Sequence, residues 1–449
     1  MRLPNPPASP SDPEAFKRIW SSAPLPEVAV YVRKANAEYY HWDELRRRTP
    51  PAGLSAEDAW WLVKFSRLHC RPLPLKDTRG NPFKYWLPDT AMEVLHDVDR
   101  QGGGVFAANS SDPAALPDMR DRVLIHSLME EAIATSQIEG AVTTREAAKE
   151  MLRTQRDPRN KSEHMIANGY RTIRLLRERL DRPMSFDLLD EIQESMTRDT
   201  LDNPDDAGRF RSPADSIHVV DIRDGEVVYS PPPAEHLKDR VGHLIEFANA
   251  SDAGDAFVHP LVKASVLHFW LAYEHPYVDG NGRTARALFY WFMLKHGYWM
   301  FEFLTISRII HAAPMQYHRS FLHSERDEND LTYFLMFQLR VTRLALRQLH
   351  QYLAQICEEQ QRIQSLPLRG LNSRQRAVLE HAAKHPKQIY TFESHRNSHN
   401  ITYQTARTDL LGLEKRDLLI RMSARQQYQF LPSPKLAQLI ARAGQPPKR

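Results

Sequence analysis

The sequence has little cysteine and no long apolar run, and each absence excludes a class of protein. Its 449 residues include two cysteines, Cys70 and Cys357, which lie far apart and match neither a disulfide framework nor a metal-ligand spacing. No stretch is long and apolar enough to span a membrane, and the proline-rich residues 1–14 lack the apolar core of a secretory signal. We therefore expect a cytoplasmic protein that makes no contact with a membrane.

Length and charge indicate more than one folded unit. A chain of 449 residues exceeds one typical domain, so we expect two or three. The formal net charge of +4 conceals an asymmetry, because residues 371–449 hold 14 Lys and Arg against 5 Asp and Glu. That balance of +9 leaves −5 for the rest of the chain, so the basic charge is concentrated near the C-terminus.

Apolar residues recur with helical spacing along most of the chain, which predicts a mainly α protein. In residues 54–70 the helix begins with Ser55 and Asp58 as a capping box, and in residues 143–152 with Thr143 as the N-cap. The other predicted helices cover residues 28–48, 122–140, 162–180, 184–201, 234–249, 259–274, 285–297 and 331–363.

Turn and break signals divide this helical pattern. Runs of β-branched residues flank Arg223-Asp224-Gly225 and predict a small β-hairpin inside the helical region. A glycine-rich stretch near residue 115 and the sequence SLPLRGLNS at 365–373 predict breaks. The predicted units are an N-terminal helical region at 1–115, a helical domain at 116–350, a linker at 351–370 and a C-terminal domain at 371–449.

The C-terminal domain has the element order of a winged helix-turn-helix. We expect helices at 373–385 and 401–417, followed by strands at 418–422 and 427–431. The second helix would present Gln404, Arg407 and Lys415 to the major groove of DNA. The same fold also serves in protein docking and in dimerisation, so the alternatives to DNA binding are docking of another protein and formation of a homodimer.

The run HPYVDGNGRTAR, from His275 to Arg286, joins two of the predicted helices and carries the chemistry. Gly280 and Gly282 permit positive φ, and Asn281 tolerates it, so successive N–H groups can converge on an anion. The N-terminus of the following helix adds positive potential at the same place. This part of the loop is therefore predicted to hold phosphate oxygens.

The charged side chains of the run suit a nucleotide di- or triphosphate. Arg283 and Arg286 are three residues apart and share a helix face, which places two cations over one anion. Asp279 can hold a magnesium ion that bridges the phosphates. At the loop entrance, a neutral His275 could take a proton from an incoming hydroxyl.

This run resembles the signature of the Fic family, His-Pro-Phe-x-Asp/Glu-Gly-Asn-Gly-Arg-x-x-Arg, with Tyr277 in place of phenylalanine. The resemblance covers roughly residues 122–343 and implies a Fic-type helical bundle with the hairpin as its substrate-binding flap. It implies transfer of AMP from ATP to a protein Ser, Thr or Tyr hydroxyl. His275 would be the general base and Asp279 the magnesium ligand. Phosphate would be bound by Gly280, Asn281, Gly282, Arg283 and Arg286.

Fic relatives also differ at one glycine of the loop. The related Doc kinases carry lysine at the position of Gly282 and transfer a phosphate group, so the glycine favours AMP transfer.

The upstream run TSQIEG, residues 135–140, resembles the inhibitory motif of the same family, Ser/Thr-x-x-x-Glu-Gly/Asn. The resemblance places Thr135, Glu139 and Gly140 in an inhibitory helix. A carboxylate at Glu139 could pair with Arg286 and occupy the place of the γ-phosphate. We therefore expect an enzyme that inhibits itself, with its own hydroxyl groups among its targets.

Other functions remain open from sequence. The loop could be a tight interhelical turn, and residues 135–139 an ordinary helix end. The chain could be a DNA-binding transcriptional regulator that carries a Fic domain, or a Fic enzyme that uses another nucleotide or removes AMP. We interpret His268 as structural, because it has no partner at metal-ligand spacing.

Overall fold

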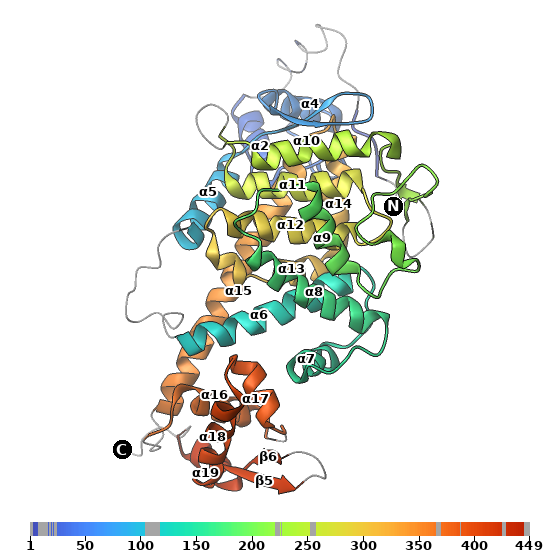
Figure 1. Cartoon of the computed structure of the whole chain (residues 1–449). Helices are drawn as coiled ribbons and strands as arrows, with labels where there is room; N and C mark the ends of the chain where they lie inside the picture. The colour runs from blue at the N-terminus through green and yellow to red at the C-terminus, as the bar shows by residue number, and fades with distance from the viewer. Residues whose placement is uncertain are drawn as a thin grey trace.

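The computed structural model is mainly α-helical, with three separate two-stranded sheets among the described residues. Figure 1 shows helices α2 and α4 at one end, a helical bundle in the middle and a smaller unit at the other end. None of the helices in the described ranges is both long and apolar enough to cross a lipid bilayer. The structure describes residues 3–7, 17, 19, 21, 25–103, 117–220, 225, 227–251, 257–364, 370–386, 388–423 and 428–443.

The N-terminal region has two small apolar clusters of its own, around Trp60 and around Leu62, and it joins the central core through Tyr39 and through residues from Leu73 onward. The helix predicted at 28–48 is interrupted at Tyr39, whose φ is 53°. The Ser55–Asp58 capping box is present, as predicted. The elements of the N-terminal region are α2 (Leu25–Glu38), α3 (Trp42–Leu45), α4 (Ala56–Ser66), β1 (Arg71–Lys76), β2 (Pro82–Tyr85), α5 (Asp89–Val98) and the π-helix η1 (Asp99–Gly103).

The hairpin β1–β2 was not predicted, and it ties the N-terminal region to the bundle. Leu75 and Phe83 are fully buried in the main hydrophobic core. Lys84 exchanges backbone hydrogen bonds with the segment before α15, at Asn329 and Leu331. The predicted boundary near residue 115 lies outside the described residues, but the core continues across it from α5 to α6.

The central bundle contains the predicted helices of residues 116–350. The N-cap of α7 is Thr144, which accepts a hydrogen bond from the amide of Ala147, so the prediction of Thr143 is wrong by one residue. The helices are α6 (Pro117–Ile138), α7 (Arg145–Thr154), α8 (Lys161–Glu178), α9 (Phe186–Thr197), α10 (Leu237–Asn249), α11 (Pro260–Glu274), α12 (Asn281–Lys295), α13 (Ile306–Ala312), α14 (Pro314–Arg326) and α15 (Thr332–Gln364). Short 3₁₀ turns are η3 (Pro204–Asp206), η4 (Ala234–His236) and η6 (Trp299–Glu302).

The predicted hairpin of the central domain is present as β3 (Val219–Val220) and β4 (Val227–Tyr229). The two strands are antiparallel and pair Val219 with Tyr229. Of the predicted turn, Arg223 and Asp224 lie outside the described residues. The hydroxyl of Tyr229 donates to the carbonyl of Tyr273 at 2.6 Å, which attaches the hairpin to α11.

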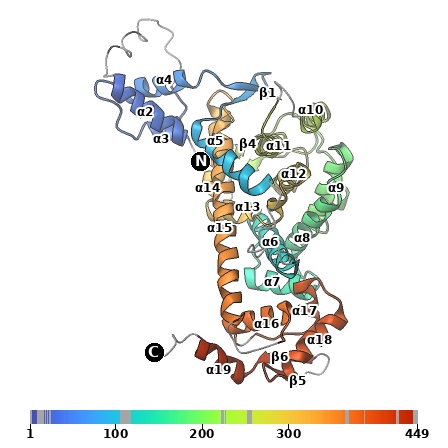
Figure 2. The ribbon, with the colours of Figure 1, turned by 90° about the vertical axis from the view of Figure 1, so that its left-hand side faces the viewer.

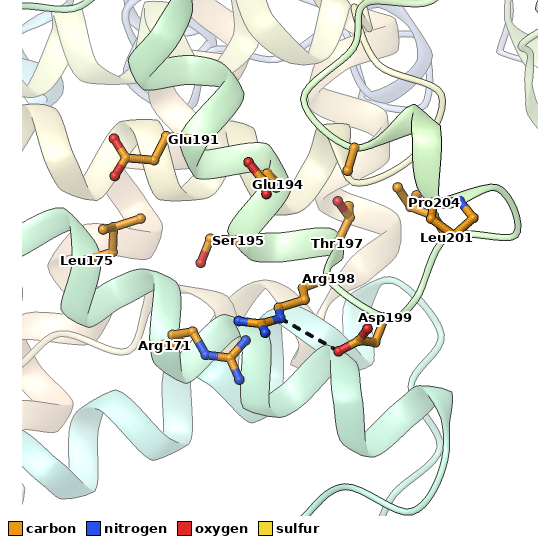
Figure 3. Close-up of a pocket in the computed structure, with 11 residues that line it drawn as sticks. Arg171, Leu175, Glu191, Glu194, Ser195, Thr197, Arg198, Asp199, Leu201 and Pro204 are labelled. Atoms are coloured by element: carbon orange, nitrogen blue, oxygen red, sulfur yellow. Dashed lines mark ion pairs between the residues drawn. The ribbon is translucent and has the colours of Figure 1, made fainter.

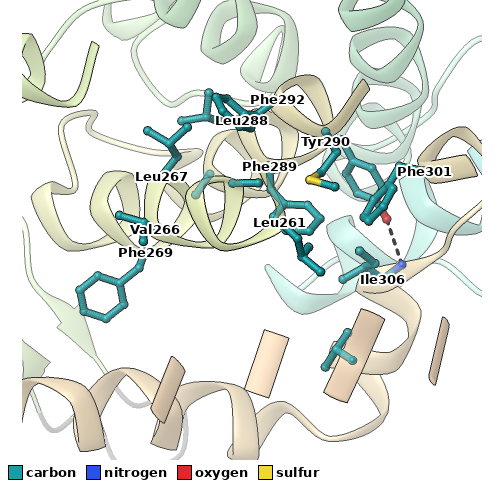
Figure 4. Close-up of a cluster of buried hydrophobic side chains, with 14 of the residues drawn as sticks. Leu261, Val266, Leu267, Phe269, Leu288, Phe289, Tyr290, Phe292, Phe301 and Ile306 are labelled. Carbon is teal, nitrogen blue, oxygen red and sulfur yellow. Dashed lines mark hydrogen bonds between the residues drawn. The ribbon is translucent and has the colours of Figure 1, made fainter. Parts of the chain in front are cut away.

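Helices α11 and α12 form the centre of the main core. Figure 4 shows their apolar side chains packed together, among them Leu267, Phe269, Leu288 and Phe292. Thirteen of the fifteen residues of α11 are buried, and so are thirteen of the fifteen residues of α12. Because both helices are fixed by packing, the loop between them is carried on a rigid base.

Helix α15 links the central bundle to the C-terminal unit. It has 33 residues and so spans about 50 Å at 1.5 Å per residue. Figure 2 shows it running along the molecule from α14 to α16. The stretch assigned to a linker at 351–370 is therefore helical as far as Gln364, and the predicted break at 365–369 lies outside the described residues.

The C-terminal unit contains one helix more than predicted before its two strands. The polar stretch between the predicted helices forms α17, which begins with a capping box at Thr391 and Ser394. The unit has its own core, in which Leu379, Leu410 and Phe430 are fully buried. Its elements are α16 (Ser373–Lys384), α17 (Phe392–His399), α18 (Tyr403–Glu414), β5 (Leu419–Ser423), β6 (Tyr428–Pro432) and α19 (Pro434–Ala443). The assignment to the winged helix-turn-helix class stays a prediction.

Candidate active site

The loop between α11 and α12 closes on itself through one side chain. Asn281 accepts a hydrogen bond from the amide of Tyr277 at 2.9 Å and donates to the carbonyl of the same residue at 2.7 Å. The backbone is left-handed at His275, with φ 48°, and at Gly280, with φ 85°. These two positions turn the chain out of α11 and back into α12.

Tyr277, the departure from the family signature, anchors the loop in the core. Its side chain is fully buried, and its hydroxyl donates to Asp190 of α9 at 2.8 Å. Its ring packs edge-on against Phe210. The extra hydroxyl of tyrosine therefore has a partner, and the buried ring holds the loop against the core.

His275 lies at the loop entrance in a state suited to accepting a proton. Its Nδ1 is 3.4 Å from the carbonyl oxygen of Ala272, which is a suitable acceptor for the Nδ1 proton. Burial lowers the pKa of His275 below its usual value, although Glu139 and Asp279 act to raise it. The neutral ring is thus favoured near pH 7, and with the proton on Nδ1 its Nε2 is left as the acceptor.

Arg211 fixes the loop from the side of the β3–β4 segment, and sequence reasoning did not single it out. Its guanidinium donates to the carbonyls of His275, Glu274 and Pro232. Its amide donates to the carbonyl of Pro276 at 2.8 Å. The cluster RFR in AGRFR was its only signal, because all its partners are backbone atoms distant in sequence.

Gly280 has the positive φ predicted for it, whereas the same prediction for Gly282 is wrong, because Gly282 lies in the first turn of α12. Both glycines lie close to other side chains. A Cβ on Gly280 would lie 2.6 Å from Cγ2 of Thr197. A Cβ on Gly282 would lie 2.3 Å from Oε1 of Glu139. The carboxylate of Glu139 therefore lies directly over the glycine-rich turn at the N-terminus of α12, where an anion is favoured.

Arg286 joins the loop to the end of α6. Its Nε donates to Oγ1 of Thr135 at 2.8 Å, and its Nη2 donates to the carbonyl of Thr135 at 3.1 Å. Nη2 also donates to Oε1 of Glu139 at 2.8 Å. Arg286 is buried, whereas the side chain of Glu139 remains 31% exposed. The structure thus brings together the two runs that the sequence separates by more than a hundred residues.

The charges around Glu139 favour its ionised form. Burial acts to raise the pKa of Glu139, but the charges of Arg286 and Arg283 and the hydrogen bond from Arg286 outweigh it and lower the pKa. Gly140 ends the helix with φ 92°, which L side chains rarely adopt. The carboxylate is therefore favoured in its ionised form near neutral pH, at the N-terminus of α12.

Arg283 differs from its predicted arrangement. Its Nη1 donates to the carbonyl of Met196 at 2.9 Å, and its Nη2 lies 3.4 Å from Oδ2 of Asp279. The guanidinium is fully buried, so its hydrogen bonds serve α9 and the loop in this state. The charges of Arg283 and Arg286 both lower the pKa of Glu139, but the hydrogen bond to its carboxylate comes from Arg286.

Asp279 is the loop carboxylate that could hold a cation. Its Oδ1 accepts from the amide of Gly280 at 2.6 Å, and its side chain is 48% exposed. Gln193 donates to its carbonyl at 3.0 Å, which fixes the backbone. Magnesium is usually held by one or two carboxylates together with phosphates, so this single exposed carboxylate beside a predicted phosphate site fits the ion.

A buried polar chain lies beneath Arg286 and was not predicted. The Tyr317 hydroxyl is close enough to Arg286 for the guanidinium to moderate the rise in its pKa, which burial raises to about 12. Nε2 of His268 is 2.8 Å from this hydroxyl, and Nδ1 of His268 is 2.8 Å from the amide nitrogen of Gln338. We therefore keep the interpretation of His268 as structural, because its hydrogen bond holds Tyr317, which lies beside Arg286.

A cavity of about 570 Å³ lies between α8 and α9, and none of the residues from His275 to Arg286 lines it. Figure 3 shows Arg171 and Arg198 lying near each other at this cavity, with Arg198 paired to Asp199. Their mutual repulsion and burial lower the pKa of Arg171, burial being the larger cause. Of the residues that line the cavity, Thr197 lies beside Gly280 of the loop. We describe the cavity separately from the candidate active site, because no residue of the loop lines it.

A second cluster of titratable residues lies in the N-terminal region. His41, Asp43 and His323 place three potential ligand atoms within 4.8 Å of one another. However, the two imidazole rings are stacked with an interplanar angle of 9° and centroids 4.1 Å apart. Since a metal ion prefers to lie in the plane of each ligating ring, nearly parallel stacked rings are poorly placed to share one. We interpret the cluster as a buried carboxylate that bridges two histidines.

The predicted DNA-binding residues lie on the outer face of α18 or just beyond it. Gln404, Arg407 and Lys415 are exposed, whereas Ala406 and Leu410 on the inner face are fully buried. Within the described residues, neither Arg407 nor Lys415 forms an ion pair. This arrangement leaves both cations accessible from solvent.

Comparison with known proteins finds a family match for the region around the loop. Residues 183–293 match the Fic/DOC family. The protein adenylyltransferase Fic of Nematostella vectensis is 26% identical over 212 residues, which are 46% of this chain and 46% of the relative. The protein adenylyltransferase fic-1 of Caenorhabditis elegans is 31% identical over 112 residues, which are 24% of this chain and 20% of the relative.

Among solved structures, a Fic family protein from Desulfovibrio desulfuricans aligns with 76% of this chain and 94% of its own, at 17% identity and a TM-score of 0.47. The chain spans less than half the length of the two curated relatives. The family match includes the whole run from His275 to Arg286 and excludes the run from Thr135 to Gly140.

Proposed function

The chain contains a Fic domain, and from this premise we propose that it is a protein adenylyltransferase. It would transfer AMP from ATP to the hydroxyl of a serine, threonine or tyrosine in a protein. The observation that carries the proposal is the position of His275 at the end of α11, in the same short loop as the glycine turn that starts α12. The names of the curated relatives agree with this reaction class.

The proposed reaction assigns one task to each group of the loop. The hydroxyl oxygen of the target attacks the α-phosphorus of ATP, and its proton passes to Nε2 of His275. The bond from the α-phosphorus to the oxygen that bridges to the β-phosphate breaks, so the products are AMP-protein and pyrophosphate. The amides of Gly280, Asn281 and Gly282 would bind phosphate oxygens. Asp279 would hold the magnesium ion, which supplies positive charge to the phosphates when bound.

Glu139 would restrain this reaction in the state described above. Its carboxylate occupies space directly over Gly282 and uses the Nη2 donor of Arg286, which a γ-phosphate oxygen would otherwise accept from. Nucleotide could bind with its α-phosphate displaced from in-line attack, and even small displacements are costly. The restraint would therefore act on transfer more than on nucleotide affinity.

Labelled ATP tests the proposal on three matched proteins: the wild type, Glu139→Gly, and Glu139→Gly combined with His275→Ala. With label on the α-phosphate, we expect Glu139→Gly to modify itself about 10- to 100-fold more than the wild type, because a charge-assisted hydrogen bond is removed. The rate of the double variant should be about 10²- to 10⁴-fold lower than that of Glu139→Gly. Each protein is first checked for folding by circular dichroism.

The position of the label separates the alternative chemistries. Label retained from the γ-phosphate would indicate phosphate transfer, and stronger labelling by another α-labelled nucleoside triphosphate would change the assigned donor. Release of AMP from a pre-labelled protein would indicate the reverse reaction. Undiminished labelling by the folded double variant would remove His275 from its role.

A second candidate function is DNA binding by the C-terminal unit, favoured by the accessible Arg407 and Lys415. Phosphate contacts make such binding fall steeply with salt. In a fluorescence anisotropy titration of the full chain with genomic DNA fragments, the wild type should bind at low salt, and Arg407→Ala with Lys415→Ala should bind more weakly. Absence of binding at low salt would leave protein docking or self-association as the use of this unit.

A further inference from the structure

Helix α17 of the C-terminal unit packs against α6 and α7, and Glu139 directly follows the last residue of α6 (Figures 1 and 2). We propose that the C-terminal unit is a regulatory clamp that holds the inhibitory end of α6 on the active site through α7. This inference rests on the proposed function and names how the same site would be regulated. It is carried by three successive sets of contacts.

The first contact joins α17 to α7. The side-chain amide of Asn397 donates to the carbonyl of Arg153, in the last turn of α7, at 2.7 Å. Burial lowers the pKa of Arg153, and Tyr390 of the C-terminal unit is near enough to oppose that shift. Asn397 also faces a cavity that is lined on the other side by Met151 and Leu152 of α7. The end of α7 is thus covered by the C-terminal unit.

The second contact joins α7 to α6. Glu130 of α6 is buried and forms ion pairs with both Arg145 and Lys149 of α7. Ile133 of α6 packs in one apolar cluster with Met151 of α7. Two charged contacts and a buried apolar contact therefore make α6 and α7 one packed unit.

The third contact joins α6 to the active site. Ile133 precedes Thr135 by two residues, and Thr135 accepts from Arg286 through both its hydroxyl and its carbonyl. Helices are stiff over one turn, so a shift of α6 at Ile133 also moves Thr135 and Glu139. The chain of contacts from Asn397 to Arg286 is continuous, which is the physical requirement for coupling between two sites.

The clamp has a direct consequence for inhibition. Glu139 is partly exposed and takes no part in the hydrogen bonds between Asn281 and Tyr277 that close the loop, so it can leave without disturbing them. Its residence time therefore depends on what holds α6 and α7 from the other side. Any event that pulls α17 away from α7 would favour release of Glu139.

Asn397→Ala and Asn397→Arg test the clamp in the full chain. Alanine removes the bond to the Arg153 carbonyl, and arginine adds a positive charge beside Arg153. Self-modification with α-labelled ATP should rise roughly two- to tenfold for Asn397→Ala and further for Asn397→Arg. Thr408→Ala is the matched control, because Thr408 belongs to the same unit, is exposed and donates its hydroxyl hydrogen bond within its own helix α18.

A combined variant and an exchange measurement separate the clamp from the reaction itself. In the Glu139→Gly background, Asn397→Arg should add no further activity, because no inhibitory contact remains to release. Hydrogen exchange should be faster at residues 135–140 in Asn397→Arg than in the wild type, whether or not AMP is transferred.

Each result then has one meaning. If Glu139→Gly is active and Asn397→Arg matches the wild type in both labelling and exchange, the clamp is overturned and the proposed function stands. If Glu139→Gly is inactive, the proposed function fails, and exchange at residues 135–140 alone decides the clamp.

Discussion

The loop from His275 to Arg286 and the end of α6 meet at one guanidinium, but they are held in different ways. The loop is closed by its own residues, since Asn281 bonds to both backbone groups of Tyr277, and Arg211 and Gln193 hold it from outside. The end of α6 contacts the loop mainly through Arg286. An active site that is complete without its inhibitor can be switched by moving the inhibitor alone.

The largest effect is expected from breaking the loop's own closure. Asn281→Ala leaves the buried amide and carbonyl of Tyr277 without their partners, at about 1–3 kcal/mol for each group. In the Glu139→Gly background, AMP transfer should fall about 10²-fold or more, because the phosphate-binding amides lose their positions. Urea unfolding and α-label transfer measure the two effects.

Asn281→Asp is the control for this prediction, since it keeps the acceptor for the Tyr277 amide but not the donor. It should lose less stability than Asn281→Ala. Equal activity of Asn281→Ala and its parent would show that the loop does not depend on its closure.

A smaller effect of opposite sign is expected on the α6 side. Thr135→Val removes the acceptor of the Arg286 Nε and should raise self-modification about three- to tenfold above the wild type. Ser136→Ala is the matched control, because Ser136 is equally buried but bonds to Ala132 within α6. If Thr135→Val lowered activity to the same extent as a loop substitution, the two sides would not differ as described.

The smallest effect concerns pH and sharpens the electrostatic side of the comparison. Burial lowers the pKa of His275 below 6.5, so the neutral base is lost only as pH falls through that lower value. Glu139 acts to raise this pKa, so Glu139→Gly should shift the acid limb of activity to still lower pH. A pH profile of initial labelling rate for Glu139→Gly with a midpoint at or above 6.5 would contradict this assignment.

Local sequence was sufficient to predict much of the structure around the loop from His275 to Arg286. The helices on either side of the loop, the left-handed Gly280 and the hairpin strands are set by residues close together in the chain, and the structure has all of them. The second of these helices was predicted to start at Ala285, but it begins at Asn281 and so includes Gly282. The pairing of Glu139 with Arg286 was also predicted, but only by way of a family resemblance. No local rule connects two residues that are separated by 147 positions.

The supports of the site could not be predicted in the same way. Arg211 and the chain from Tyr317 through His268 to Gln338 act through contacts between distant segments, and none has a spacing that marks it. The short helix α17 was missed because its residues, FESHRNSH, are polar, and its stability comes from capping and from packing against other elements. The hairpin β1–β2 was missed because proline occupies two positions of β1.

Because Gly282 has no side chain, the residue types that fit at positions 282 and 139 depend on each other. A methyl group there would overlap the Glu139 carboxylate at 2.3 Å, so no larger residue can coexist with the carboxylate in its present position. A sequence change at 282 would therefore have to be accompanied by a change at 139 or by a movement of the Glu139 side chain away from Gly282. The two positions should vary together among related sequences, with glycine at 282 wherever a glutamate occupies the inhibitory place in this geometry.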